Sequence, residues 1–554
     1  MAYRSNFEPG STRWAVRRAQ WLAMGLTEDD LLKPKIAVVN TSNQLSVCFQ
    51  HLDSISLVVQ EAIREAGGVP FEIHTAASSD FVTSAGKKGR YLMPTRDLMV
   101  NDIEVQVEGA LLDGMILLSS CDKTTPAHLM AAGRLDLPAI IVPCGYQLGS
   151  GPCEGNAVDI EDVYNSVGAY KARQISLINL QDMTSRAIQG PGVCAGMATA
   201  NTMHILSEAL GMTLTGSAPI RAGSERLIEN AIASGKRIVS MVEENLTARK
   251  ILSAGAFKNA VRTAVVIGAS VNCIRHLIAI ACETCVEVDI LTTLEEAGSL
   301  PQITQVRPNG PDRIETFDQA GGCRGVLKQL QSKLDLTVMT VDGQCLSHRC
   351  EEAPEPNRLS IRSLDDPFRK EPGLILIRGN LAPDGAIVKL SAVPPSARTF
   401  TGPCRVYEDE DEAIRDIGNG VIIAGDVVVL RMMGPLGGPG TVFAASFMAA
   451  LVGAGFGSKV AVLTDGELSG LNSGLTIGQI MPEAAEGGPL AIVHDRDQVS
   501  INLKDRLIEI KISDDELVRR LKQWKWQPSL ASGWLSQYRK LVSPMSKGAV
   551  LKTK

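Results

Sequence analysis

Two features are scarce in this sequence: long runs of charge of one sign and long uninterrupted apolar stretches. The 55 Lys and Arg residues and the 61 Asp and Glu residues leave a net charge of −6 and are dispersed along the chain. Weakly charged stretches such as 137–151 and 443–457 are shorter than the ~20 residues that cross a bilayer, and they contain several glycines. We therefore expect neither a nucleic-acid partner nor a membrane-embedded chain.

Cysteine is also sparse, with 12 residues among 554, far below the density of a disulfide-stapled secreted domain. The first ten residues, MAYRSNFEPG, lack the basic and apolar regions of a signal peptide. These two observations predict a reduced, cytoplasmic chain. Its length and its 45% content of hydrophobic residues predict about two to four globular domains that can enclose a site between them.

Short apolar runs alternate with amphipathic stretches in the first third of the chain. The predicted strands are 36–40, 70–74, 115–119 and 139–142, and the predicted helices are 53–66, 96–112 and 126–134. Strand and helix in regular alternation are typical of a doubly wound, mostly parallel α/β sheet. Such a sheet binds its ligands beyond the carboxyl ends of its strands.

The composition changes between residues 351 and 372, where the sequence EEAPEPNRLSIRSLDDPFRKEP is highly charged and contains proline. We predict an N-terminal α/β domain over 1–350, a linker over 351–372 and a β-rich second domain over 373–554. Helices are expected there near 441–452 and 514–526. The predicted strand segments are 374–378, 386–390, 420–431, 459–463, 490–493, 499–503 and 507–510.

Three cysteines follow predicted strands or a glycine-rich turn. Cys48 follows the strand 36–40, Cys121 directly follows the strand 115–119, and Cys194 lies in the turn GPGVCAG. Position alone leaves two interpretations open, a metal or cluster site and a set of buried thiols. The single C-x-x-C pair, Cys282 and Cys285, has no second pair at zinc-ribbon spacing, so a structural role is favoured for it.

Several long motifs identify a family. They are CDKTTPAHLMAA at 121–132, GVCAGMATANTM at 192–203, GPLGGPG at 434–440, TDGELSG at 464–470 and PEAAEGGP at 482–489. Over nearly its whole length the chain resembles the dihydroxy-acid dehydratase and sugar-acid (phosphogluconate, pentonate) dehydratase family. The resemblance implies an N-terminal α/β domain and a C-terminal β-barrel-like domain, with the active site between them.

The resemblance also implies an iron–sulfur cofactor held by three cysteines, which are Cys48, Cys121 and Cys194 in this sequence. We expect a [2Fe-2S] cluster, with [4Fe-4S] as the alternative. Three thiolates are one fewer than the usual four, so such a cluster keeps an iron with an open position that acts as a Lewis acid. The reaction implied is the dehydration of a 2,3-dihydroxy carboxylate to a 2-keto acid.

A magnesium ion beside the cluster is implied in the same way. The positions that match the family's magnesium ligands are Asp80, Asp122 and Lys123, and the lysine is often carbamylated in relatives. The family's general base, a serine that removes the proton from C2, matches Ser469. The catalytic residues expected from the resemblance are therefore Ser469 and Lys123.

The chain departs from the family pattern around this second metal. Phe443 stands where the family has a glutamate ligand, and Met433 replaces a second family glutamate. A phenyl ring and a thioether supply no oxygen to a hard cation, so Mg²⁺ binding is in question. Glu467 stands where many relatives have arginine, and Gln479 where they often have histidine. Glu467 either restores a carboxylate to the site or faces solvent in a loop.

Three hypotheses accommodate these departures. In the first, the chain is an ordinary dehydratase in which water, substrate or Glu467 replaces the missing ligand. In the second, it is a dehydratase specialised for another hydroxy acid, with altered metal dependence. In the third, it is a catalytically silent iron–sulfur paralogue or sensor. The favoured substrate is a small branched-chain-type dihydroxy acid, as in branched-chain amino acid biosynthesis, with a sugar acid as the alternative. We expect a homodimer or homotetramer.

Overall fold

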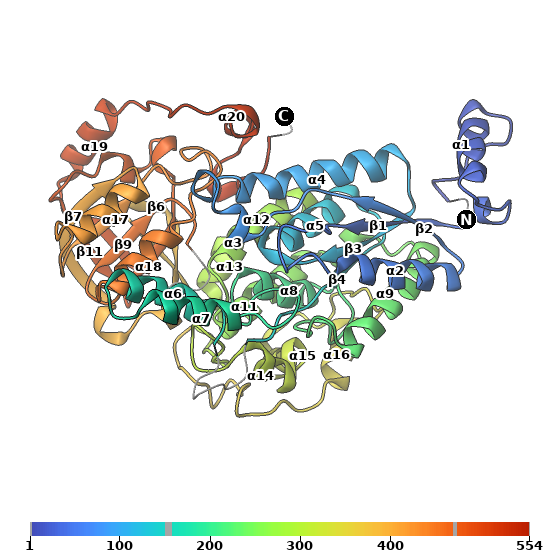
Figure 1. Ribbon diagram of the computed structural model, residues 1–554, viewed down its shortest axis with the longest axis horizontal. Helices are drawn as coiled ribbons and strands as arrows, with labels where there is room; N and C mark the ends of the chain where they lie inside the picture. Colours follow the sequence, from blue (N-terminus) through green and yellow to red (C-terminus); the bar gives the residue numbers. More distant parts are fainter. Residues whose placement is uncertain (1–2, 150–157, 469–473, 553–554) are drawn as a thin grey trace.

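The two parts of the chain form two different bodies in the computed structural model, which describes residues 3–149, 158–468 and 474–552 (Figure 1). The N-terminal body is a parallel sheet surrounded by helices, and the C-terminal body contains a closed barrel of strands. This confirms the predicted fold class, an α/β domain followed by a β-rich, barrel-like domain. Among the described residues, none of the helices combines the length and apolar composition that a membrane span requires.

The N-terminal sheet has four parallel strands in the order β2-β1-β3-β4. They are β1 (Lys35–Asn40), β2 (Val69–His74), β3 (Gly114–Ser119) and β4 (Ala139–Pro143). Every residue of β1, β3 and β4 is buried, as expected for strands that helices cover on both faces. The strand order changes direction between β1 and β3, so the carboxyl ends of these two strands form the switch point at which doubly wound folds bind ligands.

Helices cover both faces of this sheet because each presents one apolar face to it. In α2, for example, Ile55, Val59 and Ile63 recur at four-residue spacing and are all buried. Two helices begin earlier than predicted: α4 begins at Leu92 instead of 96, and α5 begins at Cys121, ahead of Pro126, which brings residues 121–125 into its first turns. The helices are α1 (Thr12–Ala23), α2 (Leu52–Glu65), α3 (Asp80–Thr83), α4 (Leu92–Gly109), α5 (Cys121–Leu135), α6 (Ile160–Lys171), α7 (Leu177–Arg186), α8 (Thr199–Ala209), α9 (Glu225–Glu243), α10 (Ala248–Ile251), α11 (Ala254–Ile267), α12 (Asn272–Thr284), α13 (Ile290–Ala297), α14 (Ile314–Gln319), α15 (Gly322–Leu330) and α16 (Leu346–Glu352).

The C-terminal barrel closes in the strand order β10-β6-β5-β12-β11-β7-β8-β9. Its strands are β5 (Leu374–Gly379), β6 (Ala382–Lys389), β7 (Thr399–Tyr407), β8 (Val427–Leu430), β9 (Ala461–Thr464), β10 (Thr476–Met481), β11 (Gln498–Asn502) and β12 (Leu507–Ile510). The helices of this body are α17 (Glu410–Gly418), α18 (Ala445–Gly453), α19 (Asp514–Gln523) and α20 (Gly533–Leu541). The helices expected near 441–452 and 514–526 thus correspond to α18 and α19.

The barrel differs from the sequence prediction in several details. The run predicted as a strand over 420–431 is extended only in β8, Val427–Leu430. The apolar run 490–493 was expected to be a strand, but Pro489–Ile492 forms a 3₁₀ turn, since Pro489 fixes a helical φ at its start. Strands β7 and β10 were not predicted. In β7 the pair Gly402 and Pro403 suggests a break, yet Pro403 pairs with Gln498 across the ladder.

The two bodies are packed closely against each other. Helix α6 of the N-terminal body lies against α18 of the barrel body, where Gly168 passes Gly453 so closely that a Cβ atom on Gly168 would lie 2.4 Å from the backbone oxygen of Ala449. Residues 353–373 form neither an α-helix nor a strand, and the backbone of Arg369 pairs with that of Gln302. The connecting segment therefore runs along the N-terminal body.

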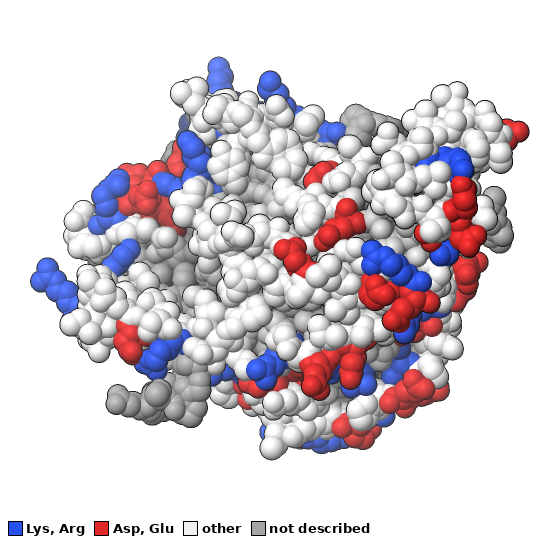
Figure 2. All heavy atoms as spheres, turned by 45° about the vertical axis from the view of Figure 1, so that its right-hand side comes forward, with Lys and Arg blue, Asp and Glu red and all other residues white. Residues whose placement is uncertain are grey.

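The charged side chains on the surface are mixed in sign. On the face drawn in Figure 2, acidic and basic groups alternate in small clusters separated by uncharged surface. This pattern agrees with the dispersed charges of the sequence and offers no extended basic field on that face.

Candidate active site

Cys48, Cys121 and Cys194 line one cavity at the switch point of the N-terminal sheet. Cys48 comes from the loop after β1, Cys121 is the first residue of α5 directly after β3, and Cys194 lies in the turn that precedes α8. The loops of Cys48 and Cys121 meet because the carboxyl ends of neighbouring parallel strands lie at one edge of the sheet, and the Cys194 turn joins them where Val193 bridges to Tyr146, which follows β4. We call these three residues the thiol cluster.

Hydrogen bonds fix the loops that present the thiols. The hydroxyl of Ser120 donates to the backbone oxygen of Cys48 at 2.6 Å, which ties the loop after β1 to the start of α5. The side-chain amide of Asn201 donates to the backbone oxygens of Cys194 at 2.6 Å and Gly196 at 2.9 Å. Cys121 itself has a left-handed backbone (φ 58°), a costly conformation for a residue with a Cβ, which such contacts sustain.

The environment of the thiol cluster disfavours free thiolates. The Cys48 thiol, burial and the Asp122 carboxyl together hold the pKa of Cys121 well above its ordinary value. Burial, followed by the Asp122 and Cys121 charges, raises the pKa of Cys194 in the same way. No Lys or Arg lies among the described residues that line their cavity, so the three thiols are suited to bind a cationic cofactor, which releases their protons as it binds.

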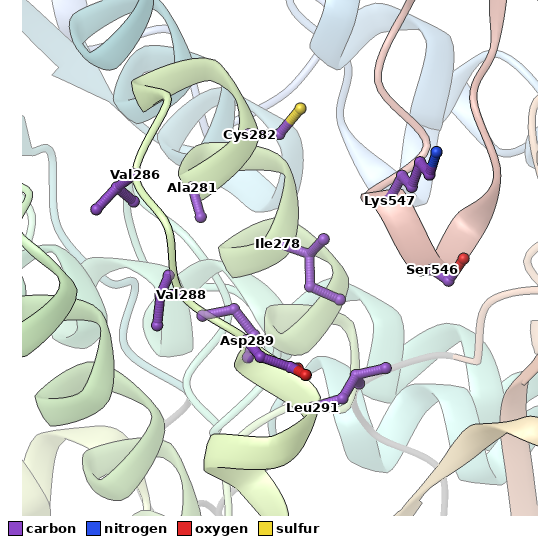
Figure 3. Close-up of a pocket in the computed structure, with 10 residues that line it drawn as sticks. Ile278, Ala281, Cys282, Val286, Val288, Asp289, Leu291, Ser546 and Lys547 are labelled. Atoms are coloured by element: carbon purple, nitrogen blue, oxygen red, sulfur yellow. The ribbon is translucent and has the colours of Figure 1, made fainter.

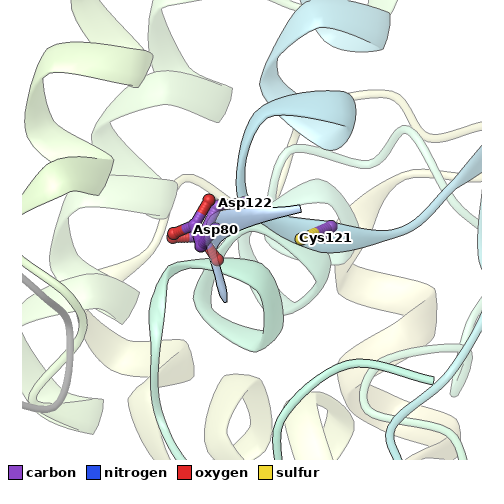
Figure 4. Close-up of side chains that lie close together, drawn as sticks. All are labelled: Asp80, Cys121 and Asp122. Atoms are coloured by element: carbon purple, nitrogen blue, oxygen red, sulfur yellow. The ribbon is translucent and has the colours of Figure 1, made fainter. Parts of the chain in front are cut away.

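Two buried carboxyl groups stand next to the thiols. Asp80, the first residue of α3, and Asp122, in the first turn of α5, each place an oxygen within 4.8 Å of each other and of the Cys121 sulfur. Figure 4 shows the two carboxyl groups side by side. Burial first, and then the Asp122 charge, holds the pKa of Asp80 well above its ordinary value. Asp80 Oδ1 has no hydrogen-bond partner among the described residues, so it is ready to accept one from a ligand.

Lys123 points into a group of buried ions that joins the two bodies. Its Nζ lies 3.3 Å from Oε1 and 3.2 Å from Oε2 of Glu467, which follows β9 of the barrel. Arg275 of α12 is paired with the same carboxylate. All three side chains are at most 1% exposed. We call Lys123, Arg275 and Glu467 the ion-pair cluster.

The charges of this cluster stabilise one another. Burial acts to lower the pKa of Lys123, but the Glu467 and Asp80 carboxylates outweigh it and the pKa is raised. Burial likewise acts to raise the pKa of Glu467, and Arg275 and Lys123 reverse that effect, so its pKa is lowered. The alternative that Glu467 faces solvent is therefore wrong, because its carboxylate is buried within the site.

The other substituted positions surround the same region. Phe443 lines the cavity of the thiol cluster, and its backbone bridges to that of Glu467. Met433 is buried, and its backbone N–H donates to Asp465 at 2.8 Å. Gln479 donates from its side chain to Asn272 Oδ1 at 3.1 Å, at the start of α12. Phe443 is thus the substituted residue that touches the cavity directly.

Sequence reasoning missed Arg275. It is the one charged residue in the apolar helix segment CIRHLIAIA, a pattern that could have marked it as a buried, paired cation. Its helix also contacts the residue that precedes the predicted base in the sequence, since Asn272 Nδ2 donates to the backbone oxygen of Leu468 at 3.1 Å. Ser469, the next residue, lies outside the described residues, so its role stays a prediction.

The C-x-x-C pair lies apart from this site. Cys282 and Cys285 are exposed at the end of α12, so they do not pack in the core. Cys282 borders a second, mostly apolar groove between α12, α13 and the C-terminal segment, in which Asp289 and Lys547 are the charged residues among those described (Figure 3). In the described part of the chain, the only close group of candidate metal ligands is the one at Asp80, Cys121 and Asp122.

The residues of the cavity fit the implied iron–sulfur cluster better than the implied magnesium ion. The thiol cluster offers three free sulfur ligands on one cavity, which suits an iron–sulfur group with an open iron. The magnesium set is incomplete, because Asp80 and Asp122 are the only carboxylates among the described residues that line the cavity, and Phe443 fills the neighbouring position. Lys123 is engaged by Glu467 instead of facing the cavity as an oxygen ligand.

Comparisons with known proteins agree with the motifs. Residues 33–349 match the family model "Dihydroxy-acid/6-phosphogluconate dehydratase N-terminal", and residues 360–549 match its C-terminal counterpart. A dihydroxy-acid dehydratase of Methanococcoides burtonii is 40% identical over 98% of this chain and 99% of its own length. A dihydroxy-acid dehydratase of Acetivibrio thermocellus is 39% identical over 98% of both chains. The chain belongs to the dihydroxy-acid/6-phosphogluconate dehydratase family.

Proposed function

We propose that this protein is a hydro-lyase that removes water from a small 2,3-dihydroxy carboxylic acid and yields a 2-keto acid. The observation that carries the proposal is the meeting of three thiols and two carboxyls on one cavity at the switch point of the sheet. Relatives named dihydroxy-acid dehydratase at about 40% identity over nearly the full chain support the same reaction.

The family is generally dependent on an iron–sulfur cluster and magnesium. We propose that Cys48, Cys121 and Cys194 hold a [2Fe-2S] cluster, with [4Fe-4S] as the alternative form. When bound, the cluster supplies an open iron whose Lewis acidity makes the C3 hydroxyl a better leaving group. No net electron transfer accompanies the dehydration, so the cofactor acts as an acid.

The protein's own groups bind and orient the acid. Asp80, with its unpartnered buried oxygen, can accept a hydrogen bond from a substrate hydroxyl. Asp122 and the thiol cluster border the same space. Ser469 is proposed to remove the C2 proton. The two residues before it contact the N-terminal body, since Glu467 pairs with Lys123 and the backbone oxygen of Leu468 accepts a hydrogen bond from Asn272. The resulting enol then tautomerises to the keto acid.

The lining of the cavity favours an acid with an apolar side chain. Phe81, Val193 and Phe443 are among the residues that line it. Among the described residues that line it there is no Lys or Arg that would neutralise a phosphate group. We therefore propose a branched-chain-type dihydroxy acid in preference to a phosphorylated sugar acid.

Anaerobic purification followed by iron and sulfide analysis tests the cofactor. A 2-keto-acid assay over branched dihydroxy acids and sugar acids then tests the reaction. We expect bound iron and sulfide, and turnover that is fastest with branched acids. Iron with turnover on no member of the panel would point to the silent paralogue or sensor, and a protein without iron would remove the mechanism.

The role of the base is tested by Ser469→Ala, with Ser500→Ala on strand β11 of the barrel as the matched control. An alanine at 469 removes the only atom proposed to take the C2 proton. Turnover should therefore disappear while the cluster absorbance stays, and the control should keep both. Wild-type activity in Ser469→Ala would show that another group is the base.

A further inference from the structure

In the ion-pair cluster an anion, the Glu467 carboxylate, faces Lys123. Both carboxylate oxygens of Glu467 lie within 3.3 Å of the lysine Nζ, in an interior where neither side chain is more than 1% exposed. The family resemblance implies that many relatives have an arginine at this position of the TDG motif, where this chain has Glu467. A cation beside residue 123 suits an anionic carbamate, whereas an anion there suits an ammonium group.

We infer that Lys123 remains a free ammonium in this protein and that this internal cation, in place of a divalent metal ion, supplies the positive charge beside Asp80 and Asp122. Forming a carbamate joins CO₂ to the neutral amine with loss of a proton, and turns the group from a cation into an anion. That anion would face the Glu467 carboxylate at about 3 Å with little water to screen the repulsion.

The second argument concerns the ligands of a divalent ion. A hard cation such as Mg²⁺ needs several oxygen ligands, and it keeps waters only where the cavity leaves room for them. Phe443 presents a ring where the family has a carboxylate, and the neighbouring Glu467 is occupied by Lys123 and Arg275. Two carboxylates, Asp80 and Asp122, are left, and both act electrostatically on Lys123.

Arg275 completes the arrangement. The Glu467 carboxylate pairs with Lys123 of α5 and also with Arg275 of α12. The two cations therefore hold the carboxylate from two different helices. Both oxygens of the carboxylate are therefore engaged by Lys123, and one of them also by Arg275, which opposes the approach of a further cation. The role of this ammonium in binding the substrate acid rests on the proposed function, but its chemical state does not.

The wild-type holoprotein gives the first test. Cluster-loaded protein is incubated with ¹³C-bicarbonate and observed by ¹³C NMR, and Mg²⁺ binding is measured separately by calorimetry. We expect no lysine carbamate signal and no stoichiometric Mg²⁺ binding. A carbamate signal that disappears in Lys123→Arg, or one equivalent of tightly bound Mg²⁺, would overturn the inference. Iron content and keto-acid production, measured on the same sample, report on the proposed function independently.

A gain-of-function pair sharpens the test. Phe443→Glu combined with Glu467→Gln adds an oxygen ligand and removes the anion that faces Lys123. We expect the double variant to bind Mg²⁺ at least about tenfold more tightly than wild type, a gain of one useful ligand. Glu283→Gln, which disrupts an ion pair with Arg134 at the other end of α5, is the matched control and should not change Mg²⁺ binding. No gain in the folded double variant would contradict the inference.

Discussion

The thiol cluster comes entirely from the N-terminal body, whereas the ion-pair cluster joins Lys123 and Arg275 of that body to Glu467 of the barrel. Among the described residues that line the cavity of the three thiols there is no Lys or Arg, and neighbouring groups and burial raise the pKa values of Cys121 and Cys194. In the ion-pair cluster each charge has a partner of opposite sign within the protein. The thiol cluster is thus suited to bind a cofactor, whereas the charges of the ion-pair cluster are paired within the protein itself.

The two clusters also differ in which parts of the fold they require. The loops of the thiol cluster are positioned by strands of one sheet and by contacts such as that of Ser120 with Cys48. The ion-pair cluster forms only when the two bodies meet, so it links the closure of the site to the assembly of the domains. Substitutions on the two sides should therefore have different consequences, one on cofactor content and the other on stability.

The largest expected effect is that of Cys121→Ser on the thiol side. A hydroxyl is a poor replacement for a soft thiolate, and three ligands are already one fewer than usual. We expect iron and sulfide affinity to fall by more than about 100-fold and turnover to be lost with it. The measurement is iron and sulfide per chain after anaerobic reconstitution, together with the keto-acid assay.

The exposed thiol of Cys282 provides the control for that experiment. Cys282→Ser should keep its iron, its absorbance and its turnover, because the groove it borders is separate from the site. Normal iron content in Cys121→Ser would show that the thiol cluster is not a cofactor site, and would remove the contrast between the two sides.

On the ion-pair side, Arg275→Met should destabilise the protein by about 3–5 kcal/mol, since it leaves buried charges with fewer partners. Adding Glu467→Met removes the anion as well, so the double variant should lose less than the sum of the single changes, with a coupling energy of roughly 1–3 kcal/mol. Urea unfolding of the four proteins in this double-mutant cycle measures the coupling.

Arg134→Met serves as the comparison for this cycle. Arg134 pairs with Glu283 and Glu104 but is partly exposed (16%), so its removal should cost less. Additive losses for Arg275→Met and Glu467→Met would mean that the two side chains are not energetically coupled and that the ion-pair cluster does not hold the bodies together.

The thiol side could be predicted from the sequence for a physical reason. Strand periodicity places Cys48 and Cys121 after two apolar runs, and in a parallel sheet such positions converge. The partner of Glu467 could not be predicted in the same way. Arg275 is 192 residues away and belongs to another body, so only the docking of the barrel reveals the pair. Strand β7 was missed because Gly402 and Pro403 imitate a turn within a real strand.

The smallest expected effect is a pH dependence that belongs to one body alone. Glu208 of α8 is fully buried and accepts hydrogen bonds from the backbone N–H groups of Gly216 at 2.9 Å and Ala218 at 2.8 Å. Burial raises the pKa of Glu208 to about 7, although the charge of Arg349 acts to lower it. Because this folded pKa lies above the unfolded value of 4.5, the stabilisation is fully present below about pH 4.5 and is lost as the pH rises towards 7.

The unfolding free energy of wild type should therefore fall between about pH 5 and pH 8 by an amount that includes up to about 3 kcal/mol from Glu208. Glu208→Gln should flatten this decline, and the exposed Glu229→Gln should leave it unchanged. Turnover per cluster should stay the same in both variants, since Glu208 lies within the N-terminal body and contacts neither the thiol cluster nor the ion-pair cluster in its hydrogen bonds. An unchanged slope in Glu208→Gln would show that this carboxyl is ionised in the folded protein at neutral pH.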